Sequence, residues 1–169
     1  MEWRIASIGD NVTIEFAVQE LKNYITSIDS NIDVAIMKVD TYQDSMKNVL
    51  WVGISNIFSP YLVQVDEPSK DDVVYINVMK GEGIITGTNE RSVLIAAYRF
   101  LREAGCRWIR PGADGEYIPK KSLENLLVTI NEKATYRHRG VCIEGATSFD
   151  HVMRMINWLP KIGMNGYFN

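Results

Sequence analysis

The chain has 169 residues, of which 46% are hydrophobic and 23% are charged, and its formal net charge is −3. This length and composition suit one soluble globular domain, or one domain with a piece of another. The negative charge disfavours a nucleic-acid-binding surface, because such a surface needs a basic face to displace phosphate counterions. No apolar run approaches the roughly 20 residues that a membrane-spanning helix needs.

Targeting signals and metal-binding motifs are also missing from the sequence. The N-terminus, Met-Glu-Trp-Arg-Ile-Ala, lacks the basic start and apolar stretch of a secretory signal. We therefore expect a cytoplasmic location, while a secreted parent protein stays open. Cys106 and Cys142 each lie within an apolar run and are interpreted as small buried hydrophobic residues. No His-Glu-x-x-His motif occurs, so we expect neither a metal site nor a cofactor.

The first part of the chain predicts strands around one amphipathic helix. Residues 3–8 alternate as a short strand, and residues 31–37 alternate as another. Between them, apolar residues recur at steps of three and four after Thr13, which we predict to be the helix N-cap. These residues are Ile14, Ala17, Val18, Leu21, Ile25 and Ile28. The continuous apolar run at 48–54 is typical of a strand buried on both faces.

The middle of the chain predicts more strands and the strongest helix. The strand-like runs are 72–79, 83–87, 106–109 and 126–130. The glycine-containing segment 80–83 predicts a hairpin turn, because glycine supplies the positive φ angles of such turns. A broad apolar face from Val93 to Ala104 predicts a helix that ends at Gly105. The fold class is therefore mixed α/β (α+β), a mixed sheet with two main helices ending near residue 131.

The last part of the chain predicts a strand–helix–strand unit. Residues 139–144 read as a strand, Ser148 as a helix N-cap, and residues 163–169 as a second strand. The apolar residues of the helix share one face: Phe149, Val152, Ile156 and Leu159. Such a unit with short links is typical of a parallel sheet. One unit cannot bury both faces of its strands, so we expect the rest of the sheet to lie beyond residue 169.

Four stretches resemble carbohydrate-active enzymes. Residues 85–101 resemble the turn and helix of accessory domains in family-20 hexosaminidases and family-67 α-glucuronidases. Gly-Cys-Arg-Trp-Ile-Arg-Pro-Gly at 105–112, followed by Gly-Glu-Tyr-Ile-Pro at 115–119, resembles a segment of α-glucuronidase-like proteins. Tyr-Arg-His-Arg-Gly at 136–140 resembles the opening of the first barrel strand of those hydrolases. Residues 159–168 resemble the end of their first barrel helix and their second strand.

The resemblance implies a division of the chain into two parts. Residues 1–131 would be a hexosaminidase domain-2-like accessory domain, zincin-like without metal, and residues 132–169 the start of a truncated (β/α)8 catalytic barrel. In such enzymes the accessory domain does not catalyse, and the catalytic carboxylates lie on later barrel strands. The resemblance thus implies a glycoside hydrolase parent, no catalytic residue in this chain, and no activity of the fragment alone. The implied partners are its own barrel and a carbohydrate substrate of the parent, without nucleic acid or membrane.

Two residues are carried over from the family as substrate-binding candidates. Arg139 matches the arginine that binds sugar hydroxyls in family-20 enzymes, a role that suits the fork of donors on a guanidinium. Glu144 matches an acidic residue at the end of the same strand, on the face where barrel sites are built. A further arginine of the family is replaced by Thr147, which favours the α-glucuronidase-like group. Arg139 as a structural ion-pair partner and Glu144 as a solvated carboxylate stay open.

Two other functions compete with the accessory domain. An independent carbohydrate-binding module would need exposed aromatic side chains, whereas Trp51 and Trp108 lie in apolar strand-like runs and are expected in the core. Trp158 is expected to pack against the accessory domain or the barrel. A small complete enzyme would need a convergent pair of carboxyl groups, and no pair stands out among the 21 acidic residues.

Overall fold

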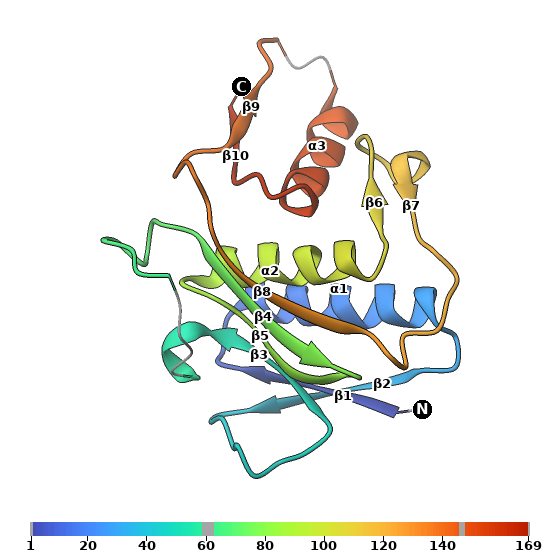
Figure 1. Cartoon of the computed structure of the whole chain (residues 1–169). Coiled ribbons are helices and arrows are strands. Elements are labelled where there is room, and N and C mark those ends of the chain that lie inside the picture. Colours follow the sequence, from blue (N-terminus) through green and yellow to red (C-terminus); the bar gives the residue numbers. More distant parts are fainter. Residues whose placement is uncertain (1, 59–62, 146–147, 169) are drawn as a thin grey trace.

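The structure is a computed structural model that describes residues 2–58, 63–145 and 148–168. Its larger elements are β1 (Glu2–Ile8), α1 (Val12–Ile28), β2 (Asp33–Val39), β3 (Val49–Ile54), β4 (Val73–Met79), β5 (Glu82–Gly87), α2 (Glu90–Glu103), β6 (Arg107–Trp108), β7 (Glu116–Tyr117), β8 (Leu127–Lys133), β9 (Gly140–Cys142), α3 (Phe149–Lys161) and β10 (Gly166–Phe168). Short 3₁₀ helices span Ser55–Ile57 and Ala113–Gly115. In Figure 1, α1 and α2 lie across one face of the main sheet, and β9, α3 and β10 stand beyond these helices.

The main sheet is mixed, which confirms the predicted fold class. Its strand order is β2-β1-β3-β5-β4-β8. The neighbours β2, β1, β3 and β5 run parallel, whereas β4 runs antiparallel to both β5 and β8. The antiparallel strands β4 and β5 are joined by a tight turn at Lys80 and Gly81, whose φ angles are 54° and 81°. The hairpin predicted at 80–83 is confirmed, and its glycine allows the backbone to pass beside the ring of Trp3.

The core lies between the sheet and the two helices. Its largest fully buried side chains include Trp3, Ile5, Ile14, Leu21, Ile25, Tyr98 and Phe100. A smaller cluster covers part of the other face of the sheet around Trp51, where Tyr42 and Phe58 pack edge-on against their neighbours. The main cluster follows from the predicted apolar patterns, since burial of apolar area is the main favourable contribution to folding. In the smaller cluster, Tyr42 and Phe58 lie outside those patterns.

Of the three residues predicted to begin or end a helix, two are confirmed. Gly105 follows the last turn of α2 with a φ of 105°, and the Ser148 side chain accepts a hydrogen bond from the backbone of His151 at the start of α3. The N-cap of α1 is Asn11 rather than Thr13, because the Asn11 side chain accepts the hydrogen bond of the Thr13 amide. An Asn two residues before this free amide is well placed to accept its hydrogen bond as an N-cap.

The unit β9–α3–β10 forms the predicted strand–helix–strand arrangement. The two strands are parallel, with Gly140 opposite Gly166 and Val141 opposite Tyr167. The predicted apolar face of α3 is only partly covered: Leu159 is buried, whereas 79% of Phe149 and 49% of Ile156 are exposed. Cys106 is buried as expected. Cys142 is exposed, contrary to expectation, and lies in β9, which pairs only with β10 among the described strands.

Candidate functional site

The most buried carboxylate of the described residues that takes part in an ion pair is that of Asp72, directly before β4. Its side chain is only 2% exposed. The guanidinium of Arg91 in α2 donates to it through Nε and Nη2, the latter at 2.8 Å. The hydroxyl of Ser92 donates at 2.8 Å as well. The turn before β4 and the first turn of α2 are thereby held together by a charged group inside the protein.

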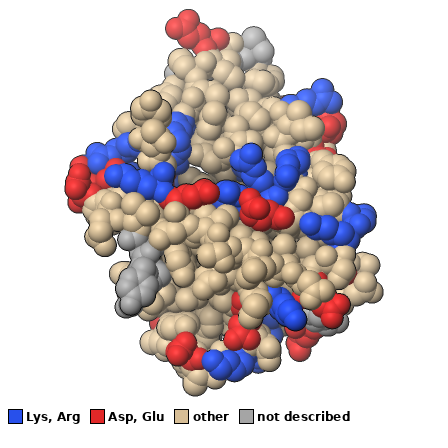
Figure 2. All heavy atoms as spheres, viewed as in Figure 1, with Lys and Arg blue, Asp and Glu red and all other residues tan. Residues whose placement is uncertain are grey.

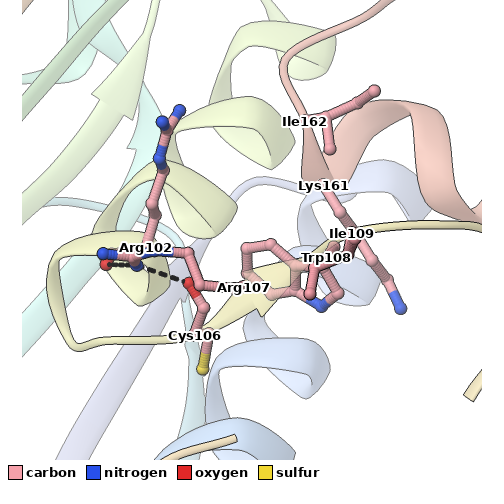
Figure 3. Close-up of a pocket in the computed structure, with 7 residues that line it drawn as sticks. All are labelled: Arg102, Cys106, Arg107, Trp108, Ile109, Lys161 and Ile162. Atoms are coloured by element: carbon pink, nitrogen blue, oxygen red, sulfur yellow. Dashed lines mark hydrogen bonds between the residues drawn. The ribbon is translucent and has the colours of Figure 1, made fainter. Parts of the chain in front are cut away.

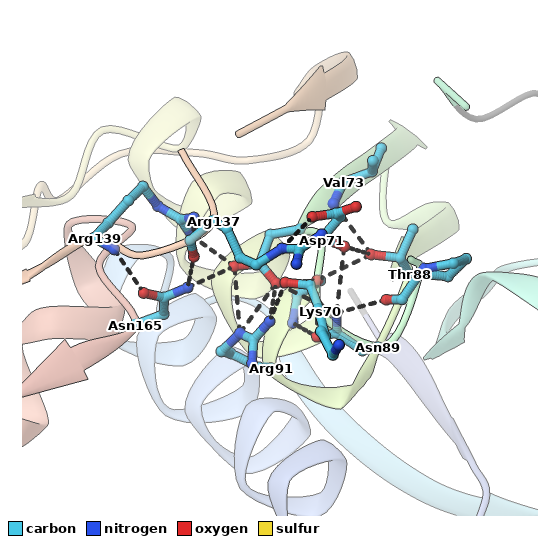
Figure 4. Close-up of polar contacts among 12 residues, drawn as sticks. Lys70, Asp71, Val73, Thr88, Asn89, Arg91, Arg137, Arg139 and Asn165 are labelled. Atoms are coloured by element: carbon cyan, nitrogen blue, oxygen red, sulfur yellow. Dashed lines mark hydrogen bonds and ion pairs between the residues drawn. The ribbon is translucent and has the colours of Figure 1, made fainter. Parts of the chain in front are cut away.

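The same carboxylate also holds the β9–α3–β10 unit. Arg139, directly before β9, donates from Nη2 to Oδ2 of Asp72 at 2.7 Å. Asn165, directly before β10, donates from Nδ2 to the same oxygen at 3.1 Å, and its Oδ1 accepts the Arg139 amide (Figure 4). Asn89, directly before α2, also donates from Nδ2 to Oδ1 of Asp72, at 3.3 Å. We call Asp72, Asn89, Arg91, Ser92, Arg139 and Asn165 the Asp72 cluster. It joins four segments of the chain: the turn before β4, the start of α2, and the residues directly before β9 and β10.

The charge of Asp72 is stabilised by these donors. Burial raises the pKa of its carboxyl, but hydrogen bonds from Arg91, Arg139 and Ser92 outweigh burial and lower the pKa from 3.8 to about 2. A buried carboxylate with several charged donors is ionised at neutral pH. The Asp72 cluster therefore contains formal charges of both signs, and the charges of Asp72, Arg91 and Arg139 stabilise one another.

A second layer of charges lies outside the Asp72 cluster. Arg137 donates from Nε to Asp71 at 2.8 Å and from Nη1 to Glu67 at 3.1 Å. Lys70 pairs with Glu67. In Figure 2, basic and acidic side chains form a belt across the middle of the visible face. A hollow of about 430 Å³ opens beside the ion pairs of Lys70 and Arg137. Its lining residues are Ser69, Lys70, Arg91, Arg137, His138 and Asn165.

We call the main sheet, α1, α2, β6 and β7 the α/β layer. Lys161, at the end of α3, forms a second contact between this layer and α3. Its side chain is 5% exposed, and its ammonium pairs with Glu116 and donates to the Tyr24 hydroxyl at 3.1 Å. The ammonium also lies 5.6 Å from the ring centroid of Tyr24 and 5.9 Å from that of Tyr98. An ammonium over aromatic faces is attracted by their negative quadrupole.

The two rings near this ammonium, those of Tyr24 and Tyr98, contact each other and the ring of Trp108 edge-on. Ring centroids lie 5.6 Å apart for Tyr24 and Trp108, and 5.4 Å apart for Tyr98 and Trp108. Trp108 donates from Nε1 to the Tyr24 hydroxyl, and burial raises the pKa of both tyrosines. We call Tyr24, Tyr98, Trp108, Glu116 and Lys161 the Lys161 cluster.

The predicted substrate-binding residues occupy opposite ends of β9. Arg139 precedes the strand, and its guanidinium donates to Asp72, to the Gly163 carbonyl and to the Tyr136 carbonyl. Glu144 follows the strand and is exposed. The structure therefore does not bring the two side chains together. Substrate binding by either residue stays a prediction, and Thr147 lies outside the described residues.

The tryptophans face the interior rather than solvent. Trp3, Trp51 and Trp108 are 2%, 3% and 6% exposed. Trp158 on α3 packs against the main core and donates from Nε1 to the Trp108 carbonyl at 3.0 Å. A sugar-stacking platform needs an exposed aromatic face, and no tryptophan supplies one.

A hollow of about 280 Å³ beside Trp108 carries no reactive group (Figure 3). Cys106 lines it, but burial raises the pKa of this thiol to about 11. Because the thiolate is the reactive form, this cysteine is a poor nucleophile at neutral pH. The other lining residues are Arg102, Arg107, Trp108, Ile109, Lys161 and Ile162.

Sequence reasoning missed most of both clusters. Asp71 and Asp72 directly before a long apolar strand were a signal, because two adjacent carboxylates at a strand start need partners. Among the described residues, no group of three or more His, Cys, Asp or Glu side chains could hold a metal ion. In the same part of the chain, no helix has the length and apolar character of a membrane span. The cytoplasmic location stays a prediction.

Comparisons with known proteins give matches among solved structures only. No protein-family model and no curated protein matches the chain. Among solved structures, the chain is similar to a family GH115 4-O-methyl-α-glucuronidase with specificity for decorated arabinogalactans, with a TM-score of 0.61 and 12% identity. The match covers 98% of this chain and 24% of the glucuronidase chain.

At 12% identity the likeness shows a shared fold and no more. The chain has the mixed α/β fold of a segment of a glycoside hydrolase, and it spans about a quarter of that enzyme's length. The structural match is to family 115, whereas the sequence motifs resemble families 67 and 20.

Proposed function

We propose that this chain is a non-catalytic accessory domain of a glycoside hydrolase and that it supports a (β/α)8 catalytic barrel. In this proposal residues 1–131 form the accessory domain, and residues 132–169 begin the barrel. The observation that carries the proposal is the double attachment of β9–α3–β10 through the Asp72 and Lys161 clusters. One cluster holds the starts of both strands, and the other holds the end of the helix.

The strand–helix–strand unit supports this assignment in two further ways. Parallel sheets occur almost only where both faces are covered, and two strands alone are of marginal stability. Here β9 and β10 pair only with each other among the described strands. Apolar side chains around them are exposed: Phe149, Met153, Ile156 and Phe168. Further barrel strands and helices would cover such side chains.

The roles of the two candidate residues differ in this proposal. Glu144 follows β9 at its carboxyl end, where (β/α)8 enzymes build their sites, so it is the better candidate for a substrate contact. All three guanidinium nitrogens of Arg139 have acceptors within the protein. This favours a role for Arg139 in holding the barrel to the accessory domain.

An independent carbohydrate-binding module is less well supported. Its expected signature is an exposed aromatic platform. The four tryptophans do not supply one, since they are buried or packed against the core. The exposed Phe149 and Phe168 belong to the β9–α3–β10 unit, where further barrel elements would cover them.

A complete small enzyme is less well supported as well. Asp114 and Glu116 line one hollow of about 680 Å³, but each carboxylate is engaged in an ion pair, with Arg110 and Lys161 respectively. Glu2 and Glu124 line another hollow of about 300 Å³, beside Trp3 and Lys80.

Hydrolysis assays test the proposal directly. Nitrophenyl glucuronides and hexosaminides are offered to the 169-residue chain and to a longer chain that contains it. We expect turnover only by the longer chain, and an E144Q substitution there should lower kcat/KM. Turnover by the 169-residue chain alone would overturn the accessory role. Saturable binding of neutral oligosaccharides to this chain would favour the binding module.

A further inference from the structure

The hollow beside the Asp72 cluster is lined mainly by hydrogen-bond donors. Lys70 comes from the loop before β4, Arg91 from α2, Arg137 and His138 from the link between β8 and β9, and Asn165 from the start of β10. The acidic partners of these residues, Glu67, Asp71 and Asp72, do not line the hollow. The wall that a ligand would meet is therefore positively charged, although the surrounding network is close to balanced.

Two guanidinium groups at this wall have N–H donors that make no hydrogen bond within the described part of the chain. A guanidinium offers five N–H donors. Arg91 uses Nε and Nη2 for Asp72 and the Lys70 carbonyl, and Arg137 uses Nε and Nη1 for Asp71 and Glu67. Nη1 of Arg91 and Nη2 of Arg137 make no hydrogen bond within the described part of the chain. Their side chains are 40% and 36% exposed, so a ligand can reach them.

The ion pairs behind the wall hold these donors in place. Each arginine is fixed by a carboxylate that is itself anchored: Asp72 is buried, and Asp71 is 15% exposed. The hydrogen bond from Arg137 holds the pKa of Asp71 below its usual value. Donors that are already oriented lose less conformational entropy when a ligand binds. Such an arrangement of arginines suits carboxylate and phosphate groups, which accept two parallel hydrogen bonds.

We propose that this hollow binds a small ligand through an oxyanion, either a carboxylate or a phosphate group, held by Arg91, Arg137 and Lys70. The volume of about 430 Å³ suits a ligand of monosaccharide size. Since the lining residues come from both the α/β layer and the β9–α3–β10 unit, a bound oxyanion would also strengthen their contact. This binding proposal does not depend on the proposed accessory function, so an experiment can support or overturn either one separately.

Calorimetric titration of the purified chain tests the site. Glucuronate and inorganic phosphate are the two probes, glucose is the neutral control, and ionic strength is held constant with chloride at pH 7. We expect saturable binding of at least one anion with a Kd on the order of 1 mM or tighter, and none of glucose at the same concentrations. The two arms distinguish a sugar acid from a phosphate. Absence of binding by both anions would overturn the proposal, as would equal binding of glucose.

Matched substitutions locate the binding. R137Q removes the Nη2 donor and the positive charge of Arg137, and it should weaken anion binding about tenfold. The control R154Q removes an exposed arginine of α3 that pairs with Asp150, and it should change the Kd less than about twofold. If R137Q does not fold, K70Q replaces it, because Lys70 is exposed and pairs only with Glu67 among the described residues. Equal effects of the site and control substitutions would place the anion elsewhere and overturn the assignment.

Discussion

The guanidinium of Arg139 donates a hydrogen bond of 2.7 Å to the carboxylate of Asp72, and the two side chains are 19% and 2% exposed. The residues lie 67 positions apart in the sequence. Asp72 also binds Arg91 and Ser92 in the first turn of α2. The α/β layer and the β9–α3–β10 unit are thus joined by a buried carboxylate that accepts hydrogen bonds from both, in addition to apolar packing. Several measurable consequences follow from this charge.

Replacing Asp72 by asparagine should destabilise the chain by about 3 kcal/mol. The substitution removes the counterion that Arg91 and Arg139 share. The cost falls mainly on Arg139, whose side chain is 19% exposed, because Arg91 is 40% exposed and can be solvated in part. Urea unfolding at pH 7 measures the change. The control is D150N, since Asp150 is 72% exposed and pairs with Arg154 on the surface of α3, where such pairs contribute little. Equal effects of the two substitutions would contradict a dominant role for Asp72.

The contribution of Asp72 should depend on pH. Its pKa is about 2 in the folded chain and 3.8 in the reference state, so the ionised form favours folding. Because the folded pKa is the lower one, the stabilisation is present above about pH 4 and is lost as the pH falls toward 2. A shift of this size corresponds to about 2 kcal/mol.

Unfolding curves of the wild type and D72N between pH 6 and pH 2 measure this dependence. Other acidic residues titrate in both proteins, so the difference between the two curves isolates Asp72. We expect that difference to shrink by about 2 kcal/mol between pH 5 and pH 2. Parallel pH profiles of the two proteins would show that Asp72 is not the titrating group.

Replacing Lys161 by methionine should loosen α3. The ammonium is 5% exposed, pairs with Glu116 and lies over two aromatic rings, whereas methionine keeps only the apolar part of the side chain. Because Glu116 is 21% exposed and is solvated in part after the change, we expect a loss of about 2 kcal/mol. Amide hydrogen exchange should increase more in α3 than in α1.

The control for this change is K120M. Lys120 is exposed, and its ammonium donates to the Ser27 carbonyl. Loss of one exposed contact should change the free energy of unfolding by less than about 0.5 kcal/mol. If K161M leaves exchange in α3 unchanged, the Lys161 cluster does not hold the helix.

The sequence predicted the elements of the fold better than their long-range contacts. Periodicity located α1, α2 and the buried strand β3, because each has an apolar pattern that depends only on local spacing. The N-cap of α1 was displaced by two residues, since Asn11 and Thr13 carry equally suitable oxygens. The order of strands in the sheet has no local pattern and could not be read from the sequence.

The candidate site was less predictable for the same reason. Arg139 was singled out through family resemblance, but its partner Asp72 has no sequence relationship to it. Lys161 follows Pro160 at the end of an amphipathic helix, where a lysine normally faces solvent and interacts with the helix dipole. Only the folded structure shows that the Lys161 ammonium lies over the aromatic rings of Tyr24 and Tyr98.

Two opposed glycines should differ sharply in their tolerance of alanine. Gly140 and Gly166 face each other across the parallel pair β9 and β10. A Cβ on Gly140 would lie 2.4 Å from the Gly166 carbonyl oxygen, so the backbone of one strand would have to move. A Cβ on Gly166 would meet the ring of Phe168 at 3.1 Å, and this exposed ring can rotate away. We therefore expect G140A to cost about 2 kcal/mol and G166A clearly less. Amide exchange of residues 140–142 and 166–168 separates the two variants, because only G140A should expose the hydrogen bonds between these strands. Equal protection in both variants would mean that β9 and β10 are not held at this close approach.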